Sequence, residues 1–147
     1  MANYCVAADL ENRISSLTLA QLTNDTANAT TYNSTVVTAI LDKVDAEIDA
    51  KAGQVYTVPF ATIPAIIKQI AIDLACYAVF QRRPVNMDMP KDWEIAHKEA
   101  LQRLDDISNL LLKLPDTATI ASAESSMNDD EVTAVSFNDT DNPMSDF

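Results

Sequence analysis

The chain has few of the residues from which reaction centres and metal sites are usually built. Among its 147 residues there is one glycine, Gly53, and one histidine, His97. A glycine-rich loop that cradles a phosphate is therefore excluded, and no nucleophile, second histidine or cysteine lies at a recognisable spacing from His97. We expect no catalytic residue, no metal site and no cofactor, and we expect that the protein is not an enzyme.

Cysteine is also scarce. Cys5 and Cys76 are the only two, and they lie far apart, without the spacing of a redox pair or a metal-binding motif. Cys76 falls within an apolar stretch and is predicted to be a small buried hydrophobic residue. These observations favour a reducing compartment.

Long apolar runs are missing. No stretch reaches the roughly 18 residues without a charge that a membrane span requires. The first residues, MANYCVAADLENR, contain neither the basic start nor the apolar run of a signal peptide. We therefore expect no contact with a membrane and synthesis in the cytoplasm.

Positive charge is scarce and unevenly distributed. Lys and Arg number 10 against 22 Asp and Glu, which gives a net charge of -12. Residues 1–114 carry 14 acids and all 10 bases, whereas residues 115–147 carry 8 acids and no base. Without a basic surplus the chain cannot hold DNA by counterion release. This change in charge composition after residue 114 predicts a helical domain over 1–114 and an acidic tail over 115–147. The tail is expected to be extended or disordered until it orders on a partner.

Apolar periodicity in the first 114 residues predicts an all-α fold, a small bundle of two short N-terminal helices and three longer ones. For the second short helix a strand remains an alternative. The predicted helices cover residues 7–14, 17–22, 34–52, 64–81 and 90–114.

Three further local expectations concern the ends of these elements. Ser34 is placed to cap one long helix, and Thr62 is placed to cap the next, with Pro64 at its first position. Gly53 should end a helix with a positive φ. In the polar loop 23–33, where glycine is absent, asparagine should supply any left-handed conformation.

The helix over 64–81 is the most apolar in the chain, because two apolar stripes run along it at helical spacing. Such a helix must be covered on most sides, by its own chain or by another copy. The stripes contain Ile63, Ile66, Ile67, Ile70, Leu74, Tyr77 and Ala78 in the first, and Ile72, Ala75, Cys76, Val79 and Phe80 in the second.

The last helix carries a third apolar stripe, at heptad spacing. His97 is one of its members, which predicts a histidine at the edge of the core. The members are Trp93, His97, Ala100, Leu104, Ile107, Leu111 and Leu114.

The order EID, VYTVP and ATIPAIIKQIAIDLACYAVFQRRP, within residues 3–112, resembles the Mu-type head-to-tail connector (head completion or adaptor) proteins of tailed phages. The resemblance implies a structural virion protein that forms a homo-oligomeric ring, commonly of twelve copies. It implies the portal protein and the next neck or tail protein as partners, and DNA passing through the lumen without specific binding. It also implies a location in the virion neck after synthesis in the host cytoplasm.

Candidate interface residues follow from the same stretch. The apolar loop before residue 64 is either a lid over the chain's own core or a contact with a neighbouring subunit or the portal. The arginine pair either complements the helix dipole or pairs with the next copy. The candidates are Tyr56, Phe60, Ile72, Val79, Phe80, Arg82 and Arg83, with Val132, Val135, Phe137 and Phe147 as anchors of the tail.

Two other functions remain open on the sequence. One is a free-standing helical regulatory or DNA-binding domain, although no basic recognition helix is present. The other is a small protein that uses its acidic tail as a DNA mimic and binds basic partners.

Overall fold

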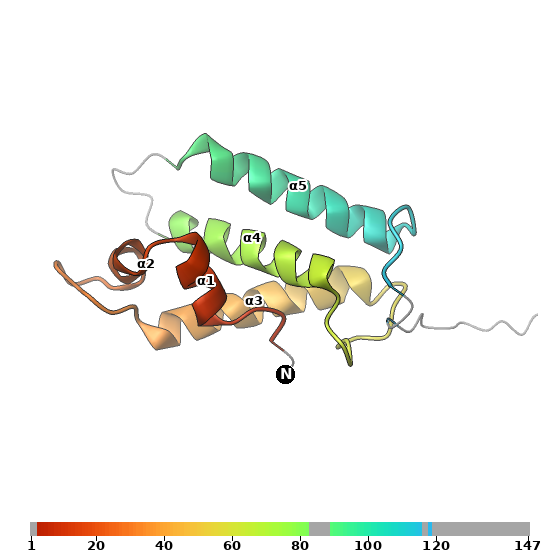
Figure 1. Cartoon of the computed structure of the whole chain (residues 1–147), viewed down its shortest axis with the longest axis horizontal. Helices are drawn as coiled ribbons and strands as arrows, with labels where there is room; N and C mark the ends of the chain where they lie inside the picture. The colour runs from red at the N-terminus through yellow and green to blue at the C-terminus, as the bar shows by residue number, and fades with distance from the viewer. Residues whose placement is uncertain (1–2, 83–88, 116–117, 119–147) are drawn as a thin grey trace, which may run out of the picture.

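The computed structural model describes residues 3–82, 89–115 and 118, and within these residues it contains helices and no strand (Figure 1). The all-α prediction is confirmed, and the strand alternative for the second element is wrong. The helices are α1 (Ala7–Arg13), α2 (Ser16–Thr23), α3 (Ser34–Ala52), α4 (Ala65–Gln81) and α5 (Lys91–Ser108).

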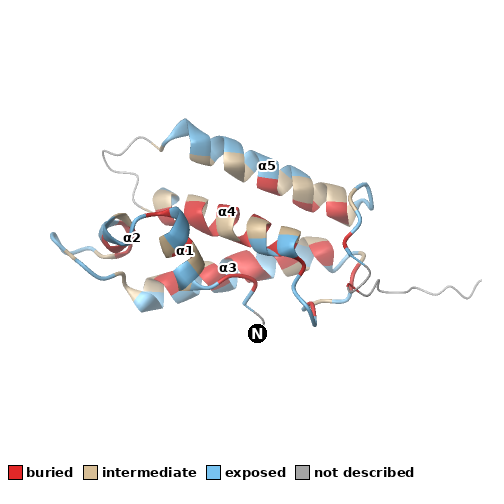
Figure 2. Ribbon diagram, in the orientation of Figure 1, coloured by how far each residue is buried: buried red, intermediate tan, exposed pale blue. Residues whose placement is uncertain are grey.

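Helix α4 lies at the centre of the bundle and packs against each of the other helices (Figure 1). Helices α3 and α5 lie along its two sides, α1 packs across its first and middle turns, and α2 lies near its C-terminal end. Figure 2 shows burial on more than one side of α4, as its apolar sequence predicts. Its buried residues are Ile67, Ile70, Ala71, Asp73, Leu74, Ala75, Cys76 and Val79.

The expected helix caps are displaced by one or two residues. The side chain of Asn33, rather than that of Ser34, caps α3, because its Oδ1 accepts from the backbone N–H of Thr35 at 3.1 Å and of Val36 at 3.3 Å. Pro64 is itself the N-cap of α4, so Thr62 is not. Asparagine and serine are both good N-caps, and adjacent candidates are not separated by propensity alone.

Gly53 does not have the positive φ that was predicted. Its φ is -66°, a right-handed value. A Cβ at this position would lie 2.5 Å from the carbonyl oxygen of Asp49 and 3.0 Å from Cγ2 of Val58, so glycine is required by close approach. In the loop 23–33, Asn28 does adopt φ 67°, which confirms that asparagine replaces glycine there.

Helix α5 ends at Ser108, not at residue 114 as predicted. The next turn has the hydrogen bonds of a Schellman motif, from Leu110 N to Ile107 O at 3.1 Å and from Leu111 N to Asp106 O at 2.8 Å. Leu110 has φ 60° at the position where glycine is usual. The apolar stripe of α5 therefore stops early, and Leu111 is 78% exposed instead of buried.

Replacing Leu110 by glycine is expected to stabilise the fold by roughly 0.5–1 kcal/mol. Glycine removes the steric strain of a leucine in the left-handed conformation. This gain exceeds the cost of the greater conformational entropy that glycine gives the unfolded chain. Urea unfolding of Leu110→Gly measures the change. Leu111→Gly is the control, because no positive φ is present there, and it should not be stabilised. If the Leu110→Gly protein is no more stable than the Leu111→Gly protein, Leu110 is not strained in the native turn.

The core extends slightly beyond the predicted domain boundary. Leu114 and Ala118 are both buried, and Tyr56 Oη accepts from Leu114 N at 3.1 Å. The rest of the predicted tail lies outside the described residues, so its extended or disordered character stays a prediction.

Candidate functional site

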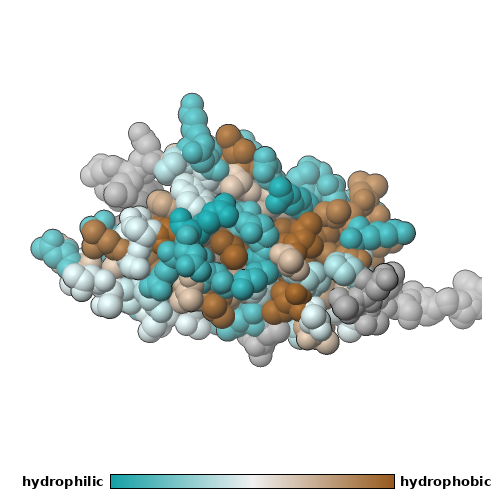
Figure 3. Space-filling model, viewed as in Figure 1, coloured by the Kyte–Doolittle hydropathy of each residue, from teal (hydrophilic) through white to brown (hydrophobic). Residues whose placement is uncertain are grey.

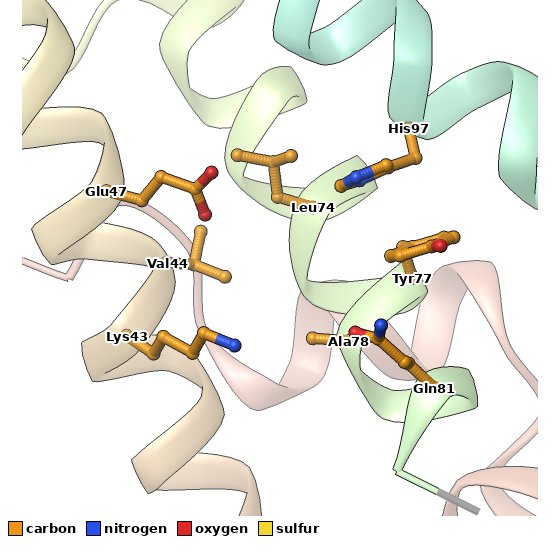
Figure 4. Close-up of a pocket in the computed structure, with 8 residues that line it drawn as sticks. All are labelled: Lys43, Val44, Glu47, Leu74, Tyr77, Ala78, Gln81 and His97. Atoms are coloured by element: carbon orange, nitrogen blue, oxygen red, sulfur yellow. The ribbon is translucent and has the colours of Figure 1, made fainter. Parts of the chain in front are cut away.

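A cavity of about 470 Å³ lies where α3, α4 and α5 meet; we call it the groove (Figure 4). Figure 4 shows that α3 contributes polar side chains directed towards α4, while apolar groups of α3 and α4 lie between them. The lining residues are Lys43, Val44, Glu47, Leu74, Tyr77, Ala78, Gln81 and His97.

His97 forms one wall of the groove by stacking on Tyr77, with ring centroids 3.8 Å apart and planes inclined by 11°. The histidine is half-buried at the edge of the core, as predicted. Burial lowers the pKa of His97, and the charge of Glu47 opposes this only in part. The imidazole is therefore mainly neutral at pH 7, and its Nδ1 has no hydrogen-bond partner among the described residues.

The described residues bring no reactive groups together around this histidine. No three His, Cys, Asp or Glu side chains in the described ranges lie close enough to hold a metal ion. Cys5 and Cys76 are both buried, which confirms the prediction for Cys76, and burial raises the pKa of each thiol to about 12. The groove presents the stacked Tyr77 and His97 rings beside a buried floor of Val44 and Leu74, and Lys43 and Glu47 place one charge of each sign at its border. The aromatic wall is a surface against which an apolar side chain can pack.

Three of the candidate interface residues are inside the chain's own core. Tyr56, Phe60 and Val79 are 3%, 5% and 0% exposed. The ring of Phe60 contacts Tyr4 at 5.8 Å and Tyr56 at 6.2 Å between centroids. In the single chain, Tyr56 and Phe60 of the loop before α4 thus pack as a lid over the bundle, as in the first of the two alternatives for it, and Val79 is buried in α4.

The second apolar stripe of α4 is also covered by the chain itself. Phe80 is half-buried against Trp93 of α5, with ring centroids 5.3 Å apart. Ile72 is half-buried as well. Arg13 of α1 lies 5.5 Å above the Trp93 ring and pairs with the buried carboxylate of Asp73 at 3.0 Å. The stripe therefore offers little free surface to a second copy.

Arg82 makes contacts inside the chain. Its guanidinium donates to the carbonyl of Leu22 at 2.9 Å and to Asp25 at 3.2 Å, which ties the end of α4 to the loop after α2. Pairing with the next copy would have to compete with these bonds. Arg83 and the tail anchors Val132, Val135, Phe137 and Phe147 lie outside the described residues.

The surface carries one apolar feature that the sequence interpretation missed. Leu110 is 46% exposed and Leu111 is 78% exposed, next to each other at the C-terminal end of α5; we call this pair the tip. The signal was present in the run SNLLLKLP, whose asparagine ends the helix before the leucines. Figure 3 shows apolar surface towards this end of the bundle.

A buried acid lies under the N-terminal segment. Asp45 is 4% exposed, and its Oδ1 accepts from Tyr4 N at 3.2 Å while its Oδ2 has no partner among the described residues. The hydroxyl of Tyr4 donates to Asp49. Burial raises the pKa of Asp45, and the neighbouring charges of Asp49 and Asp42 act in the same direction. The burial of Tyr4 likewise raises its pKa, so it stays a donor.

Asp45→Asn is expected to stabilise the fold at neutral pH by about 1 kcal/mol or more, because an amide carries no charge that burial strips of water and its oxygen can still accept from Tyr4 N. An unfolded aspartate loses its proton near pH 3.9. The folded carboxyl loses it at higher pH, so wild-type stability falls as pH rises through that window. Urea unfolding at about pH 4 and about pH 7 should show a gain that grows with pH.

The matched control is Asp42→Asn, an exposed carboxyl on the same helix, which should change stability little. An Asp45→Asn gain that is equal at both pH values would contradict a buried ionised carboxylate.

No helix in the described part of the chain has the length and apolar character that crossing a membrane needs. By its fold, the protein belongs to the class of small all-α bundles built around one central apolar helix.

A family model described as Bacteriophage Mu, Gp36 matches residues 4–132. The chain belongs to this family of bacteriophage proteins, which points to a structural, virion-related protein. The match is longer than the region 3–112 that carried the resemblance, and it includes residues 115–132 of the acidic segment. Comparison with curated proteins gives no match.

Proposed function

We propose that the chain is a head-to-tail adaptor, which forms a ring between the portal and the next neck or tail protein. The observation that carries the proposal is the family match over residues 4–132. A ring of twelve copies in the neck of the virion is the assembly that the resemblance implies. No reaction is part of this role.

The charge of the chain supports passage of DNA through such a ring. With a net charge of -12, a ring wall repels phosphate and does not bind it, so packaged DNA moves through the lumen without being held. The tail after residue 115 would supply contacts to the portal or to a neighbouring copy by ordering on that partner.

Labelling of intact virions tests this role. Antibody raised against the full chain and detected by gold particles should mark the junction of head and tail. In parallel, the purified chain should co-sediment with purified portal. Label on the capsid surface or tail fibres, or no co-sedimentation, would contradict the proposal.

The acidic segment favours one other function, a DNA mimic that binds basic proteins, because residues 115–147 carry 8 acids and no base. A protein of this kind would be a monomer or dimer, absent from virions, and would be released from basic partners by salt. The same virion labelling separates it from an adaptor.

A further inference from the structure

We propose that the tip of one copy, Leu110 and Leu111, inserts into the groove of the next copy. This contact rests on the proposed ring and names the surfaces that would build it. The occupant of the groove is then a second copy of this chain.

The tip has the properties of a docking feature. Leu111 is 78% exposed, which is the largest exposure among the large apolar side chains of the described residues. Leu110, beside it, is held at φ 60° by the turn that ends α5. Leucine is strained in this left-handed position, which glycine or asparagine would occupy with less strain. The turn projects two adjacent apolar side chains from the end of a packed helix.

The groove has room for the tip and an aromatic wall against which it can pack. Val44 and Leu74, which are 2% and 3% exposed, form its floor, and the stacked rings of Tyr77 and His97 stand beside them (Figure 4). An apolar cavity of about 150 Å³ can hold a benzene-sized group, so the groove, at about 470 Å³, has room for two leucine side chains.

The charges beside the two features are complementary. Asp106 and Lys113 flank the tip, one acid and one base. Lys43 and Glu47, again one base and one acid, border the groove. Asp106 of one copy against Lys43 of the next, with Lys113 against Glu47, would place opposite charges together at the rim, where they fix register more than they add affinity.

The two features cannot meet within one chain. His97, in the groove wall, precedes the last residue of α5 by 11 positions, which at about 1.5 Å per residue separates groove and tip by roughly 16 Å along the helix. A contact between two different patches of identical chains is heterologous and repeats head to tail. Such a contact closes into a ring when the rotation permits.

Two variants and their mixture test the contact. The tip variant carries Leu110→Gly with Leu111→Asp and keeps the groove intact. The groove variant carries Glu47→Trp, which fills the groove from an exposed position of α3 and keeps the tip intact. Circular dichroism first establishes that both retain the wild-type helix content. Native mass is then measured for each protein and for a 1:1 mixture, at the highest attainable concentration.

We expect the wild type to be oligomeric and each variant alone to be monomeric. The mixture should give only a two-chain species, twice the 16.1 kDa of one chain, because one intact tip meets one intact groove and the chain of contacts stops. Variants that still form the wild-type oligomer, or a mixture that stays monomeric, would overturn the contact while leaving the adaptor role in place. A wild type that is monomeric throughout would contradict the ring itself.

A charge-reversal pair covers the case in which Glu47→Trp fails to fold. Lys43→Glu and Asp106→Lys each place two like charges together at the rim. Because like charges at a contact repel although the native pairs add little affinity, each variant is expected to weaken assembly at least tenfold in dissociation constant. The double variant, which restores opposite charges across the contact, should recover most of that loss. Double-variant affinity no better than that of the single variants would overturn the assigned register.

Discussion

Val79→Asp is expected to remove most of the folding stability of the protein. Val79 is 0% exposed at the centre of the bundle, and a carboxylate there loses its hydration without gaining a partner. The cost should be at least about 4 kcal/mol, to be compared with the roughly 5–15 kcal/mol that a small domain has in total. Urea unfolding followed by circular dichroism should show a transition shifted far towards low denaturant, or no folded baseline.

Val6→Asp is the matched control, because it introduces the same change at a valine that is 48% exposed. It precedes α1, where a negative charge is favourable, so stability should be unchanged or slightly higher. A Val79→Asp protein that stays folded and loses only self-association would contradict the burial of Val79 and return it to the list of interface residues.

Leu104→Ala is the second large effect. Leu104 is 0% exposed on the face of α5 that packs against the bundle, and its truncation leaves a cavity. A loss of about 2–5 kcal/mol is expected. Leu111→Ala, by contrast, truncates a leucine of the same predicted stripe that is 78% exposed, and in the dissociated chain it should change the free energy of unfolding by less than about 0.5 kcal/mol.

Equal losses at these two positions would mean that α5 continues to residue 114, as its heptad spacing predicts. Equilibrium unfolding of both variants under one set of conditions decides between the two descriptions of this helix.

The sequence contained enough information to predict where helices lie, because each long helix has an apolar period and the loops between them are polar or contain proline. It also identified α4 as the helix that must be covered. It could not tell what covers it, since Val79 and Ile72 look equally apolar in the sequence. Helix α4 is covered largely by the chain's own α1, α3 and α5. This covering depends on packing between residues far apart in sequence.

Helix ends were predicted less well, for reasons visible at single residues. Gly53 suggested a left-handed turn, but the requirement there is close approach to Asp49 and Val58, which only the folded chain reveals. Leu110 adopts the left-handed turn although leucine disfavours it. Local propensity therefore favoured a longer α5 than the one observed.

The groove was not predicted at all. His97 was correctly placed at the edge of the core, but its stacking on Tyr77 joins α5 to α4 and could not be read from spacing. The prominence of the tip likewise depends on where α5 ends. Residues 115–147 belong in part to the family match, yet their partners remain a prediction that rests on composition.

Negative-stain imaging of the purified full-length chain tests the central claim most directly. The adaptor role predicts closed rings of uniform diameter with a central opening, and twelve-fold symmetry in averaged top views. A field of single-chain particles at every concentration, with a native mass of 16.1 kDa, would contradict it.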